Sequence, residues 1–267
     1  MNPKPITIIT GASSGIGKAL VLEWLHRGAK VVLAARNEEA MKEIVAGFEA
    51  DQYLILPTDI GKEDECRQLI QAAVKRFGRI DVLINNAGIS MRALFADVDL
   101  AVISRLMQIN FWGAVYCTKY ALPYLLESKG SVVGVSSIAG YKGLPARSGY
   151  SASKFALQGF LESLRIENLK TGLHVLIACP GFTASNIRKT ALAKDGSTQG
   201  ESPRAEDKMM SAETVATRIV EATLKRRRTL ILTGQGKLTV LLNKLFPKIT
   251  DKLVYNHMAK EPDSPFR

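Results

Sequence analysis

The sequence predicts a single α/β domain built on a doubly wound parallel sheet of about seven strands. Short runs of apolar and β-branched residues recur along the chain, and near-continuous runs of this kind are typical of strands buried on both faces of a parallel sheet. Longer segments of helical periodicity separate them, and such alternation favours right-handed crossovers between parallel strands. The length of 267 residues suits one domain of this class.

Strands and helices are expected in alternating order along most of the chain. The expected strands are Ile6–Thr10, Val31–Ala35, Tyr53–Leu56, Val82–Ile84, Ser131–Val135, His174–Ala178 and Thr229–Leu232. The expected helices are Gly15–Arg27, Glu38–Glu49, Glu63–Phe77, Val102–Glu127, Tyr150–Thr171 and Ala212–Arg226.

The connection after the first strand reads TGASSGIG at residues 10–17 and opens the first helix. Gly11, Gly15 and Gly17 permit a tight turn and a close approach of the backbone to a pyrophosphate. The N-terminus of the following helix adds unpaired N–H groups and the positive end of the helix dipole. The position between strand and helix makes a dinucleotide site a stronger interpretation than a plain glycine turn.

The second expected strand ends Leu33-Ala34-Ala35-Arg36. An acidic residue there would bond the ribose 2′-hydroxyl of NAD, whereas an arginine can pair bidentately with the 2′-phosphate of NADP. Arg36 lies about 20 residues after the glycines, as this role requires. We therefore favour NADP(H) over the alternative that Arg36 is a solvated residue at the start of a helix.

A polar segment at residues 182–210, which contains Gly196, Gly200 and Pro203, follows the sixth expected strand. Doubly wound sheets bind ligands at the carboxyl ends of their strands. A long loop at this place predicts a substrate lid and not a linker.

The last segment of the chain, from residue 236 to 267, is a basic amphipathic extension. Apolar residues recur from Leu238 at helical spacing, at Leu241, Leu242, Leu245 and Ile249, with lysines interleaved. Pro247 should divide the helix. The stripe either packs over the substrate cleft or against a second subunit, or it lies in a membrane interface, as basic amphipathic helices do. Packing against protein is the favoured interpretation.

The charge of the chain is strongly basic. Lys and Arg number 36 against 25 Asp and Glu, which gives a net charge of +11. This balance favours anionic partners such as a phosphorylated cofactor, an acidic carrier or a lipid surface, or it serves only solubility. Nucleic acid is not expected as a partner, because the chain has no recognised module and no interleaving of basic and aromatic residues.

The cysteines and the first residues indicate the cellular compartment in which the protein is expected. Cys66, Cys117 and Cys179 are widely spaced and odd in number, so the sequence predicts neither a disulfide framework nor a metal site. The apolar run that follows MNPKP is too short for a signal segment or a membrane span. We expect a cytoplasmic protein.

Five motifs in order resemble the classical short-chain dehydrogenases/reductases. They are TGASSGIG at 10–17, NNAG at 85–88, Asn110, Ser137 and YSASK at 150–154, and the step Pro180-Gly181 agrees with them. The resemblance covers about residues 5–235 and implies a Rossmann fold with a dinucleotide-binding and catalytic domain at residues 1–235. Together with Arg36, the extension beyond the last strand resembles the NADP-preferring, hydroxysteroid-dehydrogenase-like subgroup more than the β-ketoacyl carrier-protein reductases.

The resemblance implies roles for individual residues. Tyr150 matches the general acid/base, Lys154 the lysine that binds the nicotinamide ribose and lowers the tyrosine pKa, Ser137 the residue that hydrogen-bonds the substrate oxygen, and Asn110 the residue that holds a proton-relay water. The implied cofactor-binding residues are Gly11, Ser13, Ser14, Gly15, Ile16, Gly17, Arg36, Asp59, Ile60, Asn86, Ala87, Gly88, Tyr150, Lys154, Pro180, Gly181 and Thr183.

The chemistry explains why these residue types are needed. A tyrosine has an unperturbed pKa near ~10, which is high for proton exchange at neutral pH. Lys154 follows Tyr150 by four residues and shares its helix face, so its ammonium favours tyrosinate. The sequence thus predicts an NADP(H)-dependent oxidoreductase acting on a carbonyl or secondary alcohol of a hydrophobic, lipid- or steroid-like substrate, and a homodimer or homotetramer. The alternatives are a non-catalytic NADP(H)-binding regulator or a β-ketoacyl thioester reductase.

Overall fold

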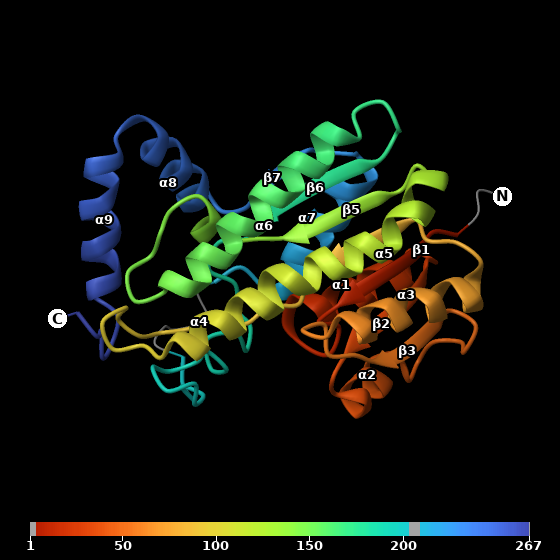
Figure 1. The fold of residues 1–267 in the computed structure, drawn as a ribbon, viewed down its shortest axis with the longest axis horizontal. Helices are drawn as coiled ribbons and strands as arrows, with labels where there is room; N and C mark the ends of the chain where they lie inside the picture. The colour runs from red at the N-terminus through yellow and green to blue at the C-terminus, as the bar shows by residue number, and fades with distance from the viewer. Residues whose placement is uncertain (1–3, 203–208, 267) are drawn as a thin grey trace.

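The computed structural model describes residues 4–202 and 209–266 of the chain. Within these residues, seven parallel strands form one sheet in the order β3-β2-β1-β4-β5-β6-β7, with helices on both faces (Figure 1). The chain runs outward from β1 to β3 and then returns to place β4 beside β1. This reversal creates the crevice where doubly wound sheets bind ligands, at the carboxyl ends of the strands.

The strands agree with the sequence prediction to within one residue at each end. They are β1 (Ile6–Thr10), β2 (Lys30–Ala35), β3 (Tyr53–Pro57), β4 (Val82–Asn85), β5 (Ser131–Val135), β6 (His174–Cys179) and β7 (Thr229–Ile231). Every residue of β1, β4, β5 and β6 is buried, whereas the edge strands β3 and β7 are partly exposed. The predicted fold class is confirmed.

The helices cover the two faces of the sheet. They are α1 (Gly15–His26), α2 (Glu38–Val45), α3 (Glu63–Phe77), α4 (Leu100–Met107), α5 (Gly113–Glu127), α6 (Ser148–Glu167), α7 (Ala212–Leu224), α8 (Gly234–Leu245) and α9 (Pro247–Ala259). One core joins α1, α2 and α7 to the sheet, and a second joins α3, α5 and α6 to its other face.

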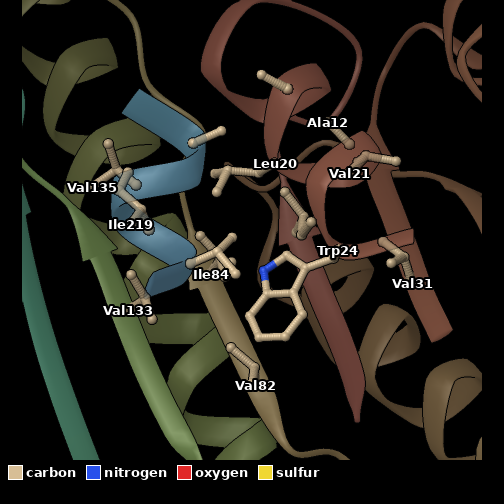
Figure 2. Packing of buried hydrophobic residues seen from close by; sticks show 14 of the residues in the cluster. Ala12, Leu20, Val21, Trp24, Val31, Val82, Ile84, Val133, Val135 and Ile219 are labelled. Carbon is tan, nitrogen blue, oxygen red and sulfur yellow. The ribbon is translucent and has the colours of Figure 1, made fainter. Parts of the chain in front are cut away.

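Side chains of successive strand residues alternate between these two cores. Ile8 belongs to the core under α3 and α5, and its neighbour Ile9 belongs to the core under α1 and α7. Figure 2 shows the core under α1 and α7, where Trp24 of α1 and Ile219 of α7 pack around Ile84 of β4. Because both faces are covered, the strands require the near-continuous apolar runs seen in the sequence.

Three of the expected helices differ most from those in the structure. The helix expected over 102–127 begins at Leu100 and is interrupted by a π-helical turn at Gln108–Trp112, which separates α4 from α5. Such turns are frequent at functional sites, and this one holds Asn110. The second helix ends at Val45, two residues before Gly47, and α6 ends at Glu167 because Asn168 and Gly172 leave the helical conformation.

The C-terminal extension forms two helices beyond the carboxyl edge of the sheet (Figure 1). As predicted, Pro247 divides the amphipathic stripe, and it stands in the first turn of α9, where proline has no N–H to lose. At the start of α8, the hydroxyl of Thr233 accepts a hydrogen bond from the Gly236 N–H at 3.0 Å. Among the described residues, no helix is both long and apolar enough to cross a membrane.

Candidate active site

A cavity of about 860 Å³ runs along the carboxyl ends of the strands and reaches the C-terminal helices. Nearly all site residues expected from the sequence line it. They are Gly11, Ser13, Ser14, Gly15, Ile16, Gly17, Arg36, Asp59, Ile60, Asn86, Ala87, Gly88, Ser137, Tyr150, Lys154, Pro180, Gly181 and Thr183. Asn110 is the exception, because it is buried and does not line the cavity.

The glycine turn leaves no room for a side chain at Gly11 or Gly17. Gly11 has φ +66°, and a Cβ atom on it would lie 2.8 Å from the Cα of Ala87. A Cβ on Gly17 would lie 1.9 Å from the carbonyl oxygen of Gly11. The Ser14 side chain does not cap α1, whose first turn also lacks an acidic residue. The turn therefore offers backbone N–H groups and a positive helix end at a surface that only glycine permits, which fits a pyrophosphate.

Arg36 is exposed at the end of β2 and lines the same end of the cavity. The acidic residues that follow it in the chain, Glu38 and Glu39, both pair with Lys42, at 3.0 and 2.8 Å. Arg36 makes no ion pair with another described residue. Its guanidinium is thus available to an anionic group bound in the cavity.

Asn86 joins the strand end at β4 to the glycine turn. Its Nδ2 donates to the carbonyl oxygens of Thr10 and Gly11, at 2.9 and 3.3 Å. The Thr10 hydroxyl accepts from the N–H groups of Asn86 and Ala87, at 3.0 and 3.1 Å. Asn86 therefore shapes the wall that the cofactor would meet. Thr10 was missed by the sequence reasoning, since a threonine at a strand end carries no distinguishing signal.

Asp59 and Ile60 line the cavity together with Arg36, and the resemblance implies an adenine contact for Asp59. The Asp59 carboxylate accepts the Gly61 N–H at 3.0 Å, while the Asp59 N–H donates to Glu65 at 2.7 Å. Ile60 is buried against Gly113, where a Cβ atom would lie 2.4 Å from the isoleucine Cδ1. These contacts fix the loop after β3 against α3 and the start of α5.

Tyr150 and Lys154 are one helical turn apart on α6, and the Lys154 Nζ lies 5.8 Å from the centre of the Tyr150 ring. Lys154 is buried, and its Nζ donates to the carbonyl oxygen of Val135 at 2.9 Å. Ser137 stands at the end of β5, beside the tyrosine hydroxyl. Because Ser137 follows a strand and Tyr150 opens a helix, the two polar groups meet at the carboxyl edge of the sheet.

The pKa values of this group depend mainly on burial. Burial lowers the pKa of Lys154 to about 8. Burial also raises the pKa of Tyr150, although the hydroxyl of Ser137 and the charges of Arg147 and Arg188 oppose the shift. The expected lowering of the tyrosine pKa by Lys154 is therefore not seen in the protein alone. Tyr150 holds its proton, as a proton donor must at neutral pH.

Asn110 uses its amide to hold the loop after NNAG. Its Oδ1 accepts the Ile89 N–H at 2.8 Å, and its Nδ2 donates to the Ile89 carbonyl and to the Ser153 hydroxyl, both at 2.9 Å. A Cβ on Gly88 would lie 3.2 Å from Asn110 Oδ1 and 3.3 Å from Lys154 Nζ. Asn110 thus positions the backbone that faces Lys154.

The far end of the cavity is formed by the loop after β6 and by the C-terminal helices. The loop contributes Phe182, Thr183, Arg188, Leu192 and Thr198, and the helices contribute Leu238, Leu242, Leu253, Val254, His257 and Met258. Residues 203–208 of the expected lid lie outside the described residues. His257, to which the sequence reasoning gave no role, lies with its ring centre 6.1 Å from that of Phe182.

Only part of the apolar stripe in the C-terminal extension lines the cavity. Leu238 and Leu242 line the cavity, yet Leu238 remains 55% exposed and Leu241, Leu245 and Ile249 are exposed to a similar degree. Leu238 and Leu242 thus pack over the cleft, as expected. The face with Leu241, Leu245 and Ile249 has no partner among the described residues.

Comparison with known proteins agrees with this geometry. The sequence profile of a family described as short chain dehydrogenase matches residues 5–196. The chain is 36% identical over 272 residues to 11-beta-hydroxysteroid dehydrogenase A of Arachis hypogaea, an alignment that covers 96% of this chain and 77% of the relative.

Two solved structures share the fold. An alcohol dehydrogenase of the archaeon Thermococcus sibiricus complexed with 5-hydroxy-NADP has a TM-score of 0.75 at 21% identity, over 86% of this chain and 96% of its own. A short chain dehydrogenase/reductase of Burkholderia phymatum in complex with NAD has a TM-score of 0.81 at 23% identity, over 92% of this chain and 95% of its own.

Proposed function

Since the chain belongs to the short chain dehydrogenase family, whose members interconvert CH–OH and C=O groups with nicotinamide cofactors, we propose that it is an NADP(H)-dependent carbonyl reductase or alcohol dehydrogenase for a hydrophobic, lipid- or steroid-like substrate. One observation carries the proposal: Ser137, Tyr150 and Lys154 face a single cavity that continues from the glycine turn to an apolar chamber. Cofactor and substrate would therefore meet beside the three polar groups.

The chemistry divides between cofactor and protein. The nicotinamide, when bound, supplies or accepts the hydride. In the reductive direction, the Tyr150 hydroxyl donates a proton to the substrate oxygen, and the Ser137 hydroxyl stabilises the charge that develops on that oxygen. Lys154, fixed by the carbonyl of Val135, is placed to hold the cofactor ribose and to favour the tyrosinate that remains. Asn110 keeps the loop at Gly88 in place.

Arg36 supports the choice of NADP(H). A free guanidinium at the end of β2 matches the 2′-phosphate, and the carboxylates of Glu38 and Glu39 that follow in the chain pair with Lys42 and not with Arg36. The net charge of +11 would add to the attraction of an anionic cofactor. The solved relatives named above include one complex with an NADP derivative and one with NAD, so this preference rests on Arg36.

The apolar chamber supports the substrate class. Its walls carry Phe182, Leu192, Leu238, Leu242 and Met258 next to Ser137 and Tyr150. A mostly apolar pocket with a few convergent polar groups is what a hydrophobic carbonyl compound needs. The name of the Arachis hypogaea relative, a hydroxysteroid dehydrogenase, points to the same class. Residues 182–210 would act as its lid, and residues 236–267 as an accessory segment to the catalytic domain at 1–235.

The exposed faces of the molecule support two further proposals. Trp112, Phe155, Ile166 and Leu169 are exposed on or next to α5 and α6, which favours pairing of these helices across a two-fold axis into a dimer or tetramer. Leu241 and Leu245 of α8 and Ile249 of α9 are exposed among lysines, which favours peripheral contact of an otherwise cytoplasmic protein with an anionic membrane.

The direct test of substrate class is NADPH oxidation over a panel of ketosteroids, sphingoid ketones, small diketones, sugars and β-ketoacyl thioesters. Turnover of steroid or lipid ketones supports the proposal. A β-ketoacyl thioester as the best substrate would favour the second candidate, an acyl reductase, whereas tight NADPH binding with no turnover of any compound would favour a regulator.

A further inference from the structure

A buried carboxylate near the C-terminus lies between two arginines from distant parts of the chain. Glu261 is 3% exposed, and its Oε2 lies 2.8 Å from Nη2 of Arg147 and 3.7 Å from Nε of Arg92. Both arginine side chains are about nine-tenths buried. Charges removed from water to this degree are retained only where they are paired, so the cluster is a specific junction and not a solvated surface contact.

The two arginines come from different segments of the chain. Arg147 precedes α6 by one residue, stands three residues before Tyr150 and lines the cavity. Arg92 belongs to the loop after β4, and its backbone N–H donates to the carbonyl of Leu192, in the loop after β6, at 2.9 Å. The side chain of Arg92 also donates to the carbonyl of Pro262. Glu261 therefore joins the C-terminal segment to the catalytic helix and to the 182–202 loop at one point.

The residues just before Glu261 form the outer wall of the apolar chamber. Leu253, Val254, His257 and Met258 of α9 line the cavity, and Met258 is fully buried. Helix α9 also contacts α8, its His257 ring lies against Phe182, and the exposed carboxylate of Asp251 pairs with Lys142. Exposed pairs of that kind contribute little. The buried junction is therefore the charged contact, withdrawn from water, that fixes the end of α9 beside the chamber.

We propose that Glu261 is a positioning residue whose buried ion pairs with Arg147 and Arg92 lock α9 over the substrate end of the cleft, so that the C-terminal segment sets which substrates fit. The effect on substrate specificity rests on the proposed oxidoreductase function, whereas the effect on the position of α9 does not. Breaking the junction leaves Arg92 and Arg147 as buried cations without the carboxylate, which drives the segment outward into water.

The test compares two substitutions in the same segment of the full-length protein. Glu261→Gln removes the buried charge at nearly constant shape. Asp263→Asn removes one negative charge two residues away, at a position that is exposed to solvent. Arg92→Gln removes one of the two cations and keeps the pair with Arg147, so it should give an intermediate effect and serves if Glu261→Gln folds poorly.

Hydrogen exchange is the first measurement, and it needs no substrate. In Glu261→Gln, amides of residues 247–262 should exchange at least about tenfold faster, because the segment opens more often. The NADPH dissociation constant, which reports on the distant glycine turn, should stay within about twofold of wild type. Asp263→Asn should match wild type in both. Unchanged exchange at 247–262 in Glu261→Gln and Arg92→Gln would overturn the proposal.

Steady-state kinetics are the second measurement. For a bulky ketosteroid, Glu261→Gln should raise KM by about tenfold with kcat within about twofold, since binding is lost and the acid/base group is untouched. KM for a small diketone should change little, because it does not reach α9. Equal losses for both substrates would overturn the specificity role. If wild type turns over neither compound, the proposed function fails while the exchange result still decides whether Glu261 locks the segment.

Discussion

The ammonium of Lys154 lies 5.8 Å from the centre of the Tyr150 ring, one turn further along α6. Lys154 is buried against the carbonyl of Val135, and Tyr150 faces the cavity beside Ser137. Burial lowers the pKa of the lysine to about 8 and raises that of the tyrosine. In the protein alone, burial therefore decides both pKa values, and a bound cofactor would act on a lysine that is close to losing its proton.

This pKa of Lys154 has a consequence for stability. A lysine in the unfolded chain keeps its proton up to a pKa near ~10.4, so between pH 8 and pH 10 the unfolded state binds more protons than the folded state, and stability contributed by Lys154 rises with pH. Below pH 8 the buried charge costs roughly 3 kcal/mol. Lys154→Met carries no charge and should be more stable than wild type at pH 7, with the difference shrinking toward pH 10.

Urea unfolding of both proteins without cofactor, at pH 7 and at pH 9.5, measures this difference. A gap in the free energy of unfolding that stays constant with pH would show that Lys154 has no lowered pKa in the folded protein. Comparing the two variants at each pH removes the contributions of all other titrating groups.

Arg36 is expected to set cofactor preference. Arg36→Asp replaces the free guanidinium by a carboxylate that repels a 2′-phosphate and can accept a bond from a 2′-hydroxyl, so NADPH affinity should fall by at least about tenfold while NADH affinity holds or rises. Dissociation constants for both cofactors are measured at one ionic strength. Arg227→Asp, an exposed change of the same charge, is the control. Equal affinities of wild type for NADPH and NADH would contradict the assignment.

Gly17 should tolerate no side chain. In Gly17→Ala the new Cβ would lie 1.9 Å from the carbonyl oxygen of Gly11, so the glycine turn must open or the helix must shift. We expect NADPH affinity to fall by about tenfold or more, with a loss of stability of roughly 1–3 kcal/mol from overpacking. Gly47→Ala is the matched control, because nothing lies within 4 Å of its Cβ. Unchanged NADPH binding by Gly17→Ala would mean that the cofactor does not use this turn.

The outer face of the C-terminal helices is tested with vesicles. If Leu241, Leu245 and Ile249 contact membranes among their lysines, full-length protein should co-sediment with anionic liposomes at low salt, and binding should weaken as salt screens the charges. Truncation after Gly236 should abolish it and leave NADPH binding intact. Absence of co-sedimentation at low salt would contradict membrane contact and favour contact of this face with a second subunit.

Features that depend on local interactions could be predicted from the sequence, whereas those that depend on contacts between distant segments could not. The strands were predicted to within one residue because burial on both faces leaves a continuous apolar run, as in Ile6–Thr10. The glycine turn follows from local backbone geometry. Asn110 was predicted as a site residue. Its π-helical turn and its hydrogen bonds to Ile89 were not, because they depend on segments that are distant in the sequence.

The substrate end shows where sequence reasoning stops. The stripe from Leu238 predicts an amphipathic helix but not what covers it, because the partner surface is supplied by Phe182 and the loop after β6. The junction of Glu261 with Arg147 and Arg92 joins residues more than 100 positions apart, and no local pattern marks it. The pKa of Tyr150, which Lys154 and a bound nicotinamide were expected to lower, is raised in the protein alone, because burial is set by the whole fold.

The central claim is that Tyr150 donates the proton, and the most direct measurement is the turnover of NADPH by Tyr150→Phe with the best ketone of the panel. The substitution removes only the hydroxyl, so NADPH binding should stay within about twofold while kcat falls by roughly 10²–10⁴-fold, the scale of a positioned acid. Tyr141→Phe, a tyrosine that does not line the cavity, should keep near-normal rates. A Tyr150→Phe enzyme with wild-type kcat would contradict the account and require another proton donor.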